Sequence, residues 1–273
     1  MNSEIRNLEP KTVWNNFADL NAVPRPSKKE ERVIAFMVDF GKKLNLETIV
    51  DKVGNVIIKK SATAGFENRK TVVMQSHLDM VHQKNSDTVF NFDKQGIEMF
   101  VDGDWVTAKG TTLGADNGLG VAAIMSVLES KTIEHPAIEA LFTIDEETGM
   151  TGAKGLEGGL LEGEILLNLD TEEDDEIGMG CAGGIDVTAK RTYSQETVSD
   201  NTSAFIISVS GLNGGHSGMD IHKGLGNANK IMNRILFDGY ENFGLQIAEI
   251  NGGSLRNAIP RESKATIVID AVS

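Results

Sequence analysis

The sequence contains one cysteine, few aromatic residues and no long apolar run. Cys181 has no partner for a disulfide within the chain, so nothing indicates an oxidising compartment. Aromatic residues make up 5% of the 273 residues, so we expect a core of Val, Ile, Leu, Ala and Met. No apolar run reaches the length of a membrane-spanning helix, and the first residues lack a signal-peptide core. We therefore expect a soluble cytoplasmic protein that binds no membrane.

Basic residues are also scarce relative to acidic ones. There are 26 Lys and Arg against 40 Asp and Glu, which gives a formal net charge of -14. Nucleic-acid binding normally needs a basic face, so this balance argues against a nucleic-acid partner. We expect most of the negative charge to be solvated surface that keeps the protein soluble.

Strands and helices alternate over the first two thirds of the chain. The spacing of Ser27 and Glu30 predicts a capping box at the start of the second helix. The alternation predicts an α/β domain with a mixed sheet covered by helices, whose active site lies beyond the carboxyl ends of the strands. The predicted helices are 15–23, 28–44 and 116–130, the strands are 55–59, 71–75, 137–144 and 165–169, and a hairpin spans 90–107.

After Gly184 the pattern changes to short alternating strands around one helix. This succession suits the start of a smaller α+β domain with an antiparallel sheet. We therefore predict a catalytic domain at 1–186 and an incomplete lid or dimerisation domain at 187–273. The predicted strands of the second domain are 186–191, 205–209 and 265–269, and its helix is 223–237.

Four polar motifs carry the chemical signal. They supply one imidazole and several carboxylates, most of them after apolar runs, and such a set suits a pair of divalent cations. The motifs are Ser76-His77-Leu78-Asp79-Met80, Gly114-Ala115-Asp116-Asn117-Gly118, Asp145-Glu146-Glu147-Thr148-Gly149 and Asn168-Leu169-Asp170-Thr171-Glu172. Together they predict a hydrolase with two catalytic metal ions.

Each motif also has an ordinary structural interpretation. His77 and Asp79 match a surface histidine beside a loop aspartate, or a metal ligand oriented by a neighbouring carboxylate. Asp116 matches a helix cap, or a carboxylate that bridges two cations. Glu146 and Glu147 match a solvated turn, or a general base and a metal ligand that project to opposite sides.

Three further features bear on the site. The glycines around Asp116 match no phosphate-binding pattern, and an aspartate at their centre would repel phosphate, so we reject a nucleotide site. Asp170 repeats the pattern of an apolar strand with an acidic end. His216, in Gly214-Gly215-His216-Ser217-Gly218, either caps local backbone or presents an imidazole to a substrate.

In this order, the motifs resemble the di-zinc metallopeptidase family that includes carboxypeptidases, aminoacylases and dipeptidases. The forms Ser-His-Leu-Asp-Met-Val, Leu-Gly-Ala-Asp-Asn-Gly, Asp-Glu-Glu-Thr-Gly-Met-Thr-Gly-Ala and Gly-Cys-Ala-Gly-Gly look closest to its aminoacyl-histidine dipeptidase branch. The resemblance implies a homodimer that hydrolyses Xaa-His and other dipeptides with a water activated by two divalent cations. Zinc is the default cation, with cobalt and manganese as alternatives.

The resemblance also implies a role for each candidate metal ligand. His77 and Asp170 would hold one metal, Glu147 would hold the other, and Asp116 would bridge both. Asp79 would orient the imidazole of His77.

Three other residues match positions that act on the substrate. Glu146 would be the general base. His216 would reach a neighbouring active site across a dimer and stabilise the oxyanion, and Asn257 would contact the substrate.

The chain departs from the family pattern at its end. The family takes a further histidine for the second metal, and an arginine for the substrate carboxylate, from segments beyond the part of the lid present here. The chain stops at Ser273, so we expect the N-terminal part of a longer protein with four of five metal ligands. The alternatives are another amidohydrolase of the family, such as a tripeptidase or an N-acyl-amino-acid deacylase, and an inactive metal-binding fragment.

Overall fold

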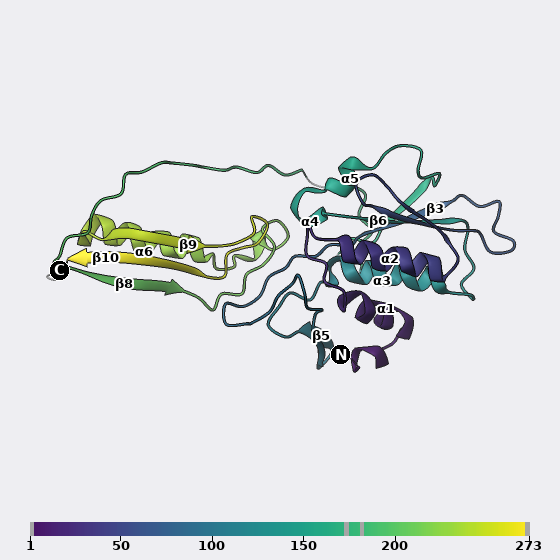
Figure 1. Ribbon diagram of the computed structural model, residues 1–273, viewed down its shortest axis with the longest axis horizontal. Helices are drawn as coiled ribbons and strands as arrows, with labels where there is room; N and C mark the ends of the chain where they lie inside the picture. The colour runs from purple at the N-terminus through teal and green to yellow at the C-terminus, as the bar shows by residue number, and fades with distance from the viewer. Residues whose placement is uncertain (1–2, 172–174, 181–182, 271–273) are drawn as a thin grey trace. The chain divides into compact units, whose positions relative to one another are not determined.

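The computed structural model describes residues 3–171, 175–180 and 183–270. The chain forms two compact units, Met1–Cys181 and Ala182–Ser273 (Figure 1). Each unit has its own apolar core. Among the helices of the described ranges, none combines the length and the hydropathy needed to cross a membrane.

The first unit is built on a five-stranded mixed sheet in the order β1-β2-β6-β3-β7. The β1–β2 and β2–β6 pairs are antiparallel, and the β6–β3 and β3–β7 pairs are parallel. The predicted α/β class with a mixed sheet is therefore confirmed. The elements are η1 (Ile5–Asn7), α1 (Lys11–Asn21), α2 (Glu31–Lys43), β1 (Glu47–Val50), β2 (Val56–Lys60), β3 (Val72–His77), β4 (Met99–Asp102), β5 (Trp105–Ala108), α3 (Ala115–Glu129), β6 (Ile138–Thr143), α4 (Glu146–Gly149), α5 (Thr151–Gly155) and β7 (Ile165–Asn168).

Helices α2 and α3 cover one face of this sheet, and α1 packs against α3 (Figure 1). Because side chains alternate along a strand, Val56 and Ile58 join the core beneath these helices, whereas Ile57 joins a smaller cluster on the other face. The main core is almost entirely aliphatic, and Phe142 is the single aromatic among its buried residues. The scarcity of aromatic residues thus predicts the composition of the core correctly.

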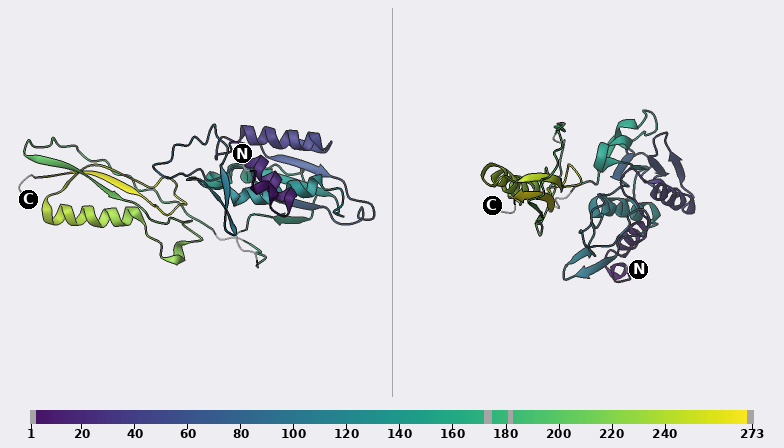
Figure 2. Two further views of the ribbon diagram at one scale, coloured as in Figure 1. Left: turned by 90° about the horizontal axis from the view of Figure 1, so that it is seen from below. Right: turned by 60° about the vertical axis from the view of Figure 1, so that its left-hand side comes forward.

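The second unit is a three-stranded antiparallel sheet in the order β8-β10-β9, with α6 along one face (Figure 2). Met232 and Leu236 of α6 pack against Ala265 and Ile267 of the central strand. Its elements are β8 (Thr202–Val209), η2 (Ile221–Lys223), α6 (Ala228–Phe243), β9 (Gln246–Gly252) and β10 (Ser263–Asp270).

The structure corrects three predicted elements. Residues 186–191 form no strand, because they stay exposed and pair with no described strand, so their alternating pattern has nothing to bury against. The predicted helix at 223–237 begins later, since Gly224 is left-handed at φ 66° and the Asn227 side chain caps the helix by accepting from the Lys230 amide. The predicted hairpin is confined to 99–108, and strands β1 and β9 were not predicted.

The predicted capping box is also wrong. Glu30 precedes α2 without a side-chain cap, and Ser27 turns its hydroxyl to Asp79 instead. The local spacing is right for a cap, but a distant carboxylate is the better acceptor.

Candidate metal centre

The four polar motifs meet where three parallel strands end. β3 ends at His77, and its parallel neighbours β6 and β7 are followed by Glu146 and Asp170. Because parallel strands have their carboxyl ends at the same edge of a sheet, these side chains gather there. Asp116 reaches the same place because α3 begins at Ala115, beside the end of β3.

His77 is 0% exposed, and both ring nitrogens face a carboxylate. Its Nε2 lies 3.0 Å from Asp116 Oδ1. Its Nδ1 lies 3.3 Å from Asp79 Oδ1 and 3.1 Å from the Asp79 carbonyl oxygen. The interpretation as a surface histidine is therefore wrong. An Nδ1–H that donates to Asp79 leaves Nε2 as the atom to bind a cation.

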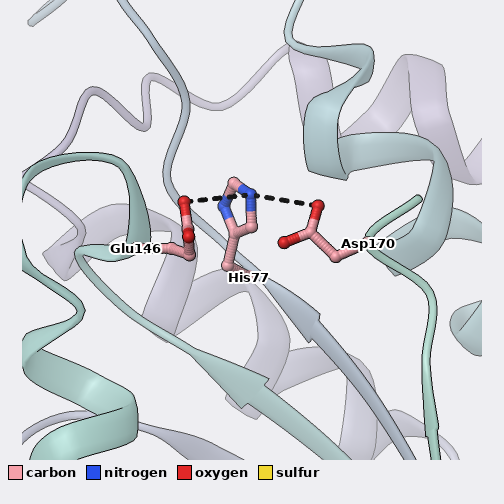
Figure 3. Close-up of side chains that lie close together, drawn as sticks. All are labelled: His77, Glu146 and Asp170. Carbon is pink, nitrogen blue, oxygen red and sulfur yellow. Dashed lines mark ion pairs between the residues drawn. The ribbon is translucent and has the colours of Figure 1, made fainter. Parts of the chain in front are cut away.

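The carboxylates of Glu146 and Asp170 lie on either side of the His77 ring (Figure 3). The His77 Nε2 atom is 3.9 Å from Glu146 Oε2 and 3.8 Å from Asp170 Oδ1. These three residues form one group whose ligand atoms lie within 4.8 Å of one another, and His77, Asp116 and Glu147 form a second. The two groups share His77 and contain all four predicted ligands together with the predicted base.

Asp79 holds the strand end and the two glutamates in place. Its Oδ1 accepts from the Glu146 amide at 3.0 Å, and its Oδ2 accepts from the Glu147 amide at 3.3 Å. The Ser27 hydroxyl donates to the same Oδ2 at 2.7 Å. Burial opposes ionisation of Asp79, but the hydrogen bond and charge of His77 outweigh it and hold the Asp79 pKa below its usual value.

Asn117 holds Asp170 in a similar way. Its Nδ2 donates to Asp170 Oδ1 at 2.7 Å and to the Leu169 carbonyl oxygen at 3.0 Å. Asp116 and Asn117 have non-helical backbone angles, and the peptide bond between them is cis. The residue that precedes α3 is Gly114, left-handed at φ 72°, so Asp116 is not the helix cap.

Burial and neighbouring charges raise several pKa values at the centre. Burial and the charge of Asp116 raise the pKa of Glu147 to about 7. Burial opposes protonation of His77, yet its hydrogen bonds with Asp116 and Asp79 raise its pKa to about 10. Burial also raises the pKa values of Glu146 and Asp170. Cation binding at this centre must therefore displace protons.

The residues present fit a pair of divalent cations. One imidazole and four carboxylates are the ligand types that zinc, manganese and cobalt accept. Glu147 Oε1 is buried and has no hydrogen-bond partner among the described residues, so it is available as a ligand atom. Burial and the charge of Asp116 raise the pKa of Glu147, and a bound cation would oppose both effects.

The stability of the metal-free chain should fall as the pH rises. The pKa of His77 is raised in the folded chain, so protonated His77 adds to the free energy of unfolding. This stabilisation is complete below about pH 6.5 and is lost as the pH rises towards 10. Glu147, with a raised pKa of about 7, acts in the same direction between about pH 4.5 and 7. We expect a Tm at pH 9 that is lower than at pH 6 by at least roughly 3 °C, which corresponds to about 1 kcal/mol.

Thermal scans of the chelated chain across this pH range measure the effect. His77→Gln should remove much of the dependence, whereas replacement of the exposed His222 by Gln should leave it intact. A Tm that rises from pH 6 to pH 9 would contradict the expectation.

A third group of carboxylates lies behind His77, formed by Glu30, Asp79 and Asp145. All three are buried. The amides of Lys28 and Asp145 donate to Glu30, and two threonine hydroxyls donate to the Asp145 carboxylate. These hydrogen bonds tie the group to the turn that carries Glu146.

The other two predicted substrate residues lie in the second unit and are close to each other. His216 forms an isolated antiparallel bridge with Ala258, and the Ser217 amide donates to the Asn257 carbonyl oxygen at 2.8 Å. His216 Nδ1 accepts from the amides of Gly218 and Met219, each at 3.1 Å. The interpretation of His216 as a cap of local backbone is thus correct, and it leaves Nε2 with the proton.

Comparison with known proteins agrees with the motifs. Residues 207–273 match the family described as Peptidase dimerisation domain. The cytosol non-specific dipeptidase of Escherichia coli (strain K12) is 49% identical over 269 residues, which are 98% of this chain and 56% of that protein. The crystal structure of aminoacylhistidine dipeptidase from Vibrio alginolyticus has 48% identity and a TM-score of 0.66, covering 99% of this chain and 55% of that one. The predicted resemblance to this dipeptidase branch is confirmed.

A more distant structure shares the fold alone. Aminopeptidase PepT from Bacillus cereus is 19% identical with a TM-score of 0.52, covering 96% of this chain and 66% of that one. The chain spans about half the length of the curated relatives it matches.

Proposed function

We propose that this chain carries the metal-binding half of a dipeptidase that hydrolyses the amide bond of Xaa-His and other dipeptides. The observation that carries the proposal is that three carboxylates gather around the imidazole of His77. They belong to Asp116, Glu147 and Asp170, and Glu146 lies beside them. The similarity to two dipeptidases over nearly the whole chain supports the substrate class.

His77 and Asp170 would hold one cation, Glu147 would hold the other, and Asp116 would bridge them. Two cations in such a site supply Lewis acidity for the scissile carbonyl and lower the pKa of the nucleophilic water. Asp79 would keep the proton of His77 on Nδ1, so that Nε2 remains a ligand atom.

Glu146 is the general base of the proposed reaction. Its carboxylate lies beside the ligand group without being required as a ligand, and its amide is anchored on Asp79. Burial raises its pKa, and a base is most effective when its pKa lies near the working pH. Glu146 would take a proton from the attacking water and deliver it to the leaving amine.

His216 is suited to stabilise the oxyanion. Because its Nδ1 accepts two backbone hydrogen bonds, the neutral ring carries its proton on Nε2 and can donate it to a developing negative oxygen. The carbonyl oxygen of Asn257 accepts a hydrogen bond from the amide of Ser217, the residue after His216. Asn257 would therefore contact the substrate beside His216. We propose that His216 serves the active site of a second copy in a homodimer, which the match to a dimerisation domain supports.

The proposal is tested by metal content and by a substrate panel. After zinc loading and desalting, the purified chain should retain two metal ions, and its apparent stability should rise by RT ln(1 + [L]/Kd) with free zinc. When dipeptides, tripeptides and N-acyl amino acids are assayed in parallel, dipeptides should be hydrolysed with the highest kcat/KM. Preference for tripeptides or acylated amino acids would favour another amidohydrolase of the family, and metal binding without any turnover would favour an inactive fragment.

Metal identity and location complete the proposal. Zinc is the expected ion because the ligand set joins an imidazole to carboxylates, and cobalt or manganese would also fit. We propose a cytoplasmic location because the similar dipeptidase of Escherichia coli is named a cytosol enzyme. Elemental analysis of protein purified without added metal identifies the ion.

A further inference from the structure

The segment Pro24–Ser27 joins α1 to α2 and lies against the chain just beyond His77. Pro26 forms a parallel bridge with Met80, and the Ser27 hydroxyl donates to Asp79. The side chain of Arg25 is the largest fully buried side chain among the described residues, with 1% of its surface exposed. Arg25 is neither a metal ligand nor the general base of the proposed reaction.

Arg25 makes four hydrogen bonds to two separate parts of the centre. Its Nη1 donates to the carbonyl oxygens of Leu78 and Asp79, each at 3.1 Å. Its Nη2 donates to the Gly114 carbonyl oxygen at 2.6 Å and to Asn21 Oδ1 at 2.9 Å. One planar group therefore connects the segment that follows His77 with the turn that precedes Asp116.

All four acceptors are neutral, so the guanidinium is not there as half of a buried ion pair. Burying it costs free energy and lowers its pKa to about 10, while the charges of Asp79, Asp116 and Glu147 oppose that shift. Arg25 therefore stays protonated at neutral pH. Its positive charge offsets part of the repulsion among these carboxylates.

The guanidinium of Arg25 lies directly against two glycines of the Asp116 motif. A Cβ atom on Gly114 or on Gly118 would lie 2.6 Å from Nη2. Gly114 is also left-handed at φ 72°, a conformation that L side chains rarely adopt. The glycines of the Asp116 motif thus admit the guanidinium as well as shaping the turn.

We propose that Arg25 is a positioning residue that fixes the separation of the His77 and Asp116 segments and so the geometry of the metal ligands. The inference rests on the proposed function, because it assigns that geometry to metal binding. Lysine would keep the charge but not the planar fork that reaches both segments at once. Ser27 acts on the same centre through its hydrogen bond to Asp79.

The first test is hydrogen–deuterium exchange of the metal-free chain. In Arg25→Lys we expect the amides of Leu78 and Gly118, which donate to Thr143 and Gly114, to exchange at least about tenfold faster than in the wild type. Ile57→Ala is the matched control, because Ile57 is fully buried in the smaller cluster on the other face of the sheet, which contains none of these segments. The control variant should not speed the exchange of the Leu78 and Gly118 amides more than that of other amides.

The second test is metal affinity, measured for zinc by chelator competition and for cobalt by its visible absorption. Arg25→Lys should bind both metals about tenfold to hundredfold more weakly and should shift the cobalt spectrum. Replacing a group that orients a metal ligand commonly has an effect of this size. Ile57→Ala should bind within about twofold of the wild type, since its cluster lies on the other face of the sheet.

The two tests separate the failure of this inference from that of the proposed function. If the wild-type chain binds neither zinc nor cobalt, the proposed function fails, while exchange still decides whether Arg25 joins the segments. If Arg25→Lys matches the wild type in both tests, the Arg25 inference is overturned and the proposed function stands. If Arg25→Lys does not fold, Gly118→Ala, which pushes against Nη2, must produce the same local change in exchange; unchanged exchange in it overturns the inference.

Discussion

Replacement of Glu146 by Gln is expected to lower kcat for dipeptides by about 100-fold to 10,000-fold, the range that a general base contributes. The amide keeps the shape of the side chain but cannot take a proton from water. Because Glu146 stands beside the ligand group and its backbone is held by Asp79, the metal content should be unchanged. Steady-state kinetics combined with elemental analysis measures both quantities.

The matched control is Glu164→Gln. Glu164 is an exposed residue that pairs with Lys70 next to β7, outside the centre, so kcat should stay at the wild-type value. If Glu146→Gln retains full activity with two metals bound, Glu146 is not the base. If it loses its metals instead, Glu146 is a ligand, an assignment that its grouping with His77 and Asp170 also permits.

Replacement of Asp116 by Ala is expected to abolish tight binding of metal. Asp116 is the carboxylate closest to His77 Nε2, at 3.0 Å, and is assigned to both cations. The wild-type chain should gain about 2.7 kcal/mol of stability when free zinc is 100 times its Kd, and the variant should gain almost none. Thermal scans with and without zinc measure this difference.

The metal-free variant should remain folded. Removing Asp116 takes one negative charge from a crowded group, which relieves the repulsion that adds to burial in raising the pKa of Glu147. Asp39→Ala, at an exposed position of α2, should show the same zinc-dependent rise in Tm as the wild type. An undiminished zinc response in Asp116→Ala would remove Asp116 from the ligand set.

Much of the centre could be predicted because its ligand residues lie close in the sequence to the strands that position them. Each of three parallel strands ends in, or is soon followed by, polar side chains, and parallel strands bring their carboxyl ends to one edge of the sheet. The apolar run of Val56, Ile57 and Ile58 likewise indicates a strand, and in the structure this strand is buried on both faces. The ligand types His, Asp and Glu indicate a divalent cation before any geometry is known.

The supporting hydrogen bonds could not be predicted in this way. Ser27 and Glu30 have the spacing of a helix cap, yet in the folded chain they bond to Asp79 and to the Asp145 amide. Arg25 is followed in the sequence by Pro26 and reads as part of a loop, although it is fully buried. Asn117 belongs to a recognised motif, but nothing local indicates that it would hold Asp170.

The sequence by itself determined the fold class, the aliphatic core and the residue types of the centre, because burial and ligand chemistry depend on each side chain and its near neighbours. Only the tertiary structure decided which donor meets which acceptor. It turned Ser27 from a helix end to Asp79, connected two distant segments through Arg25, and left residues 186–191 without a strand partner. Such choices depend on segments far apart in the chain that come together only in the folded protein.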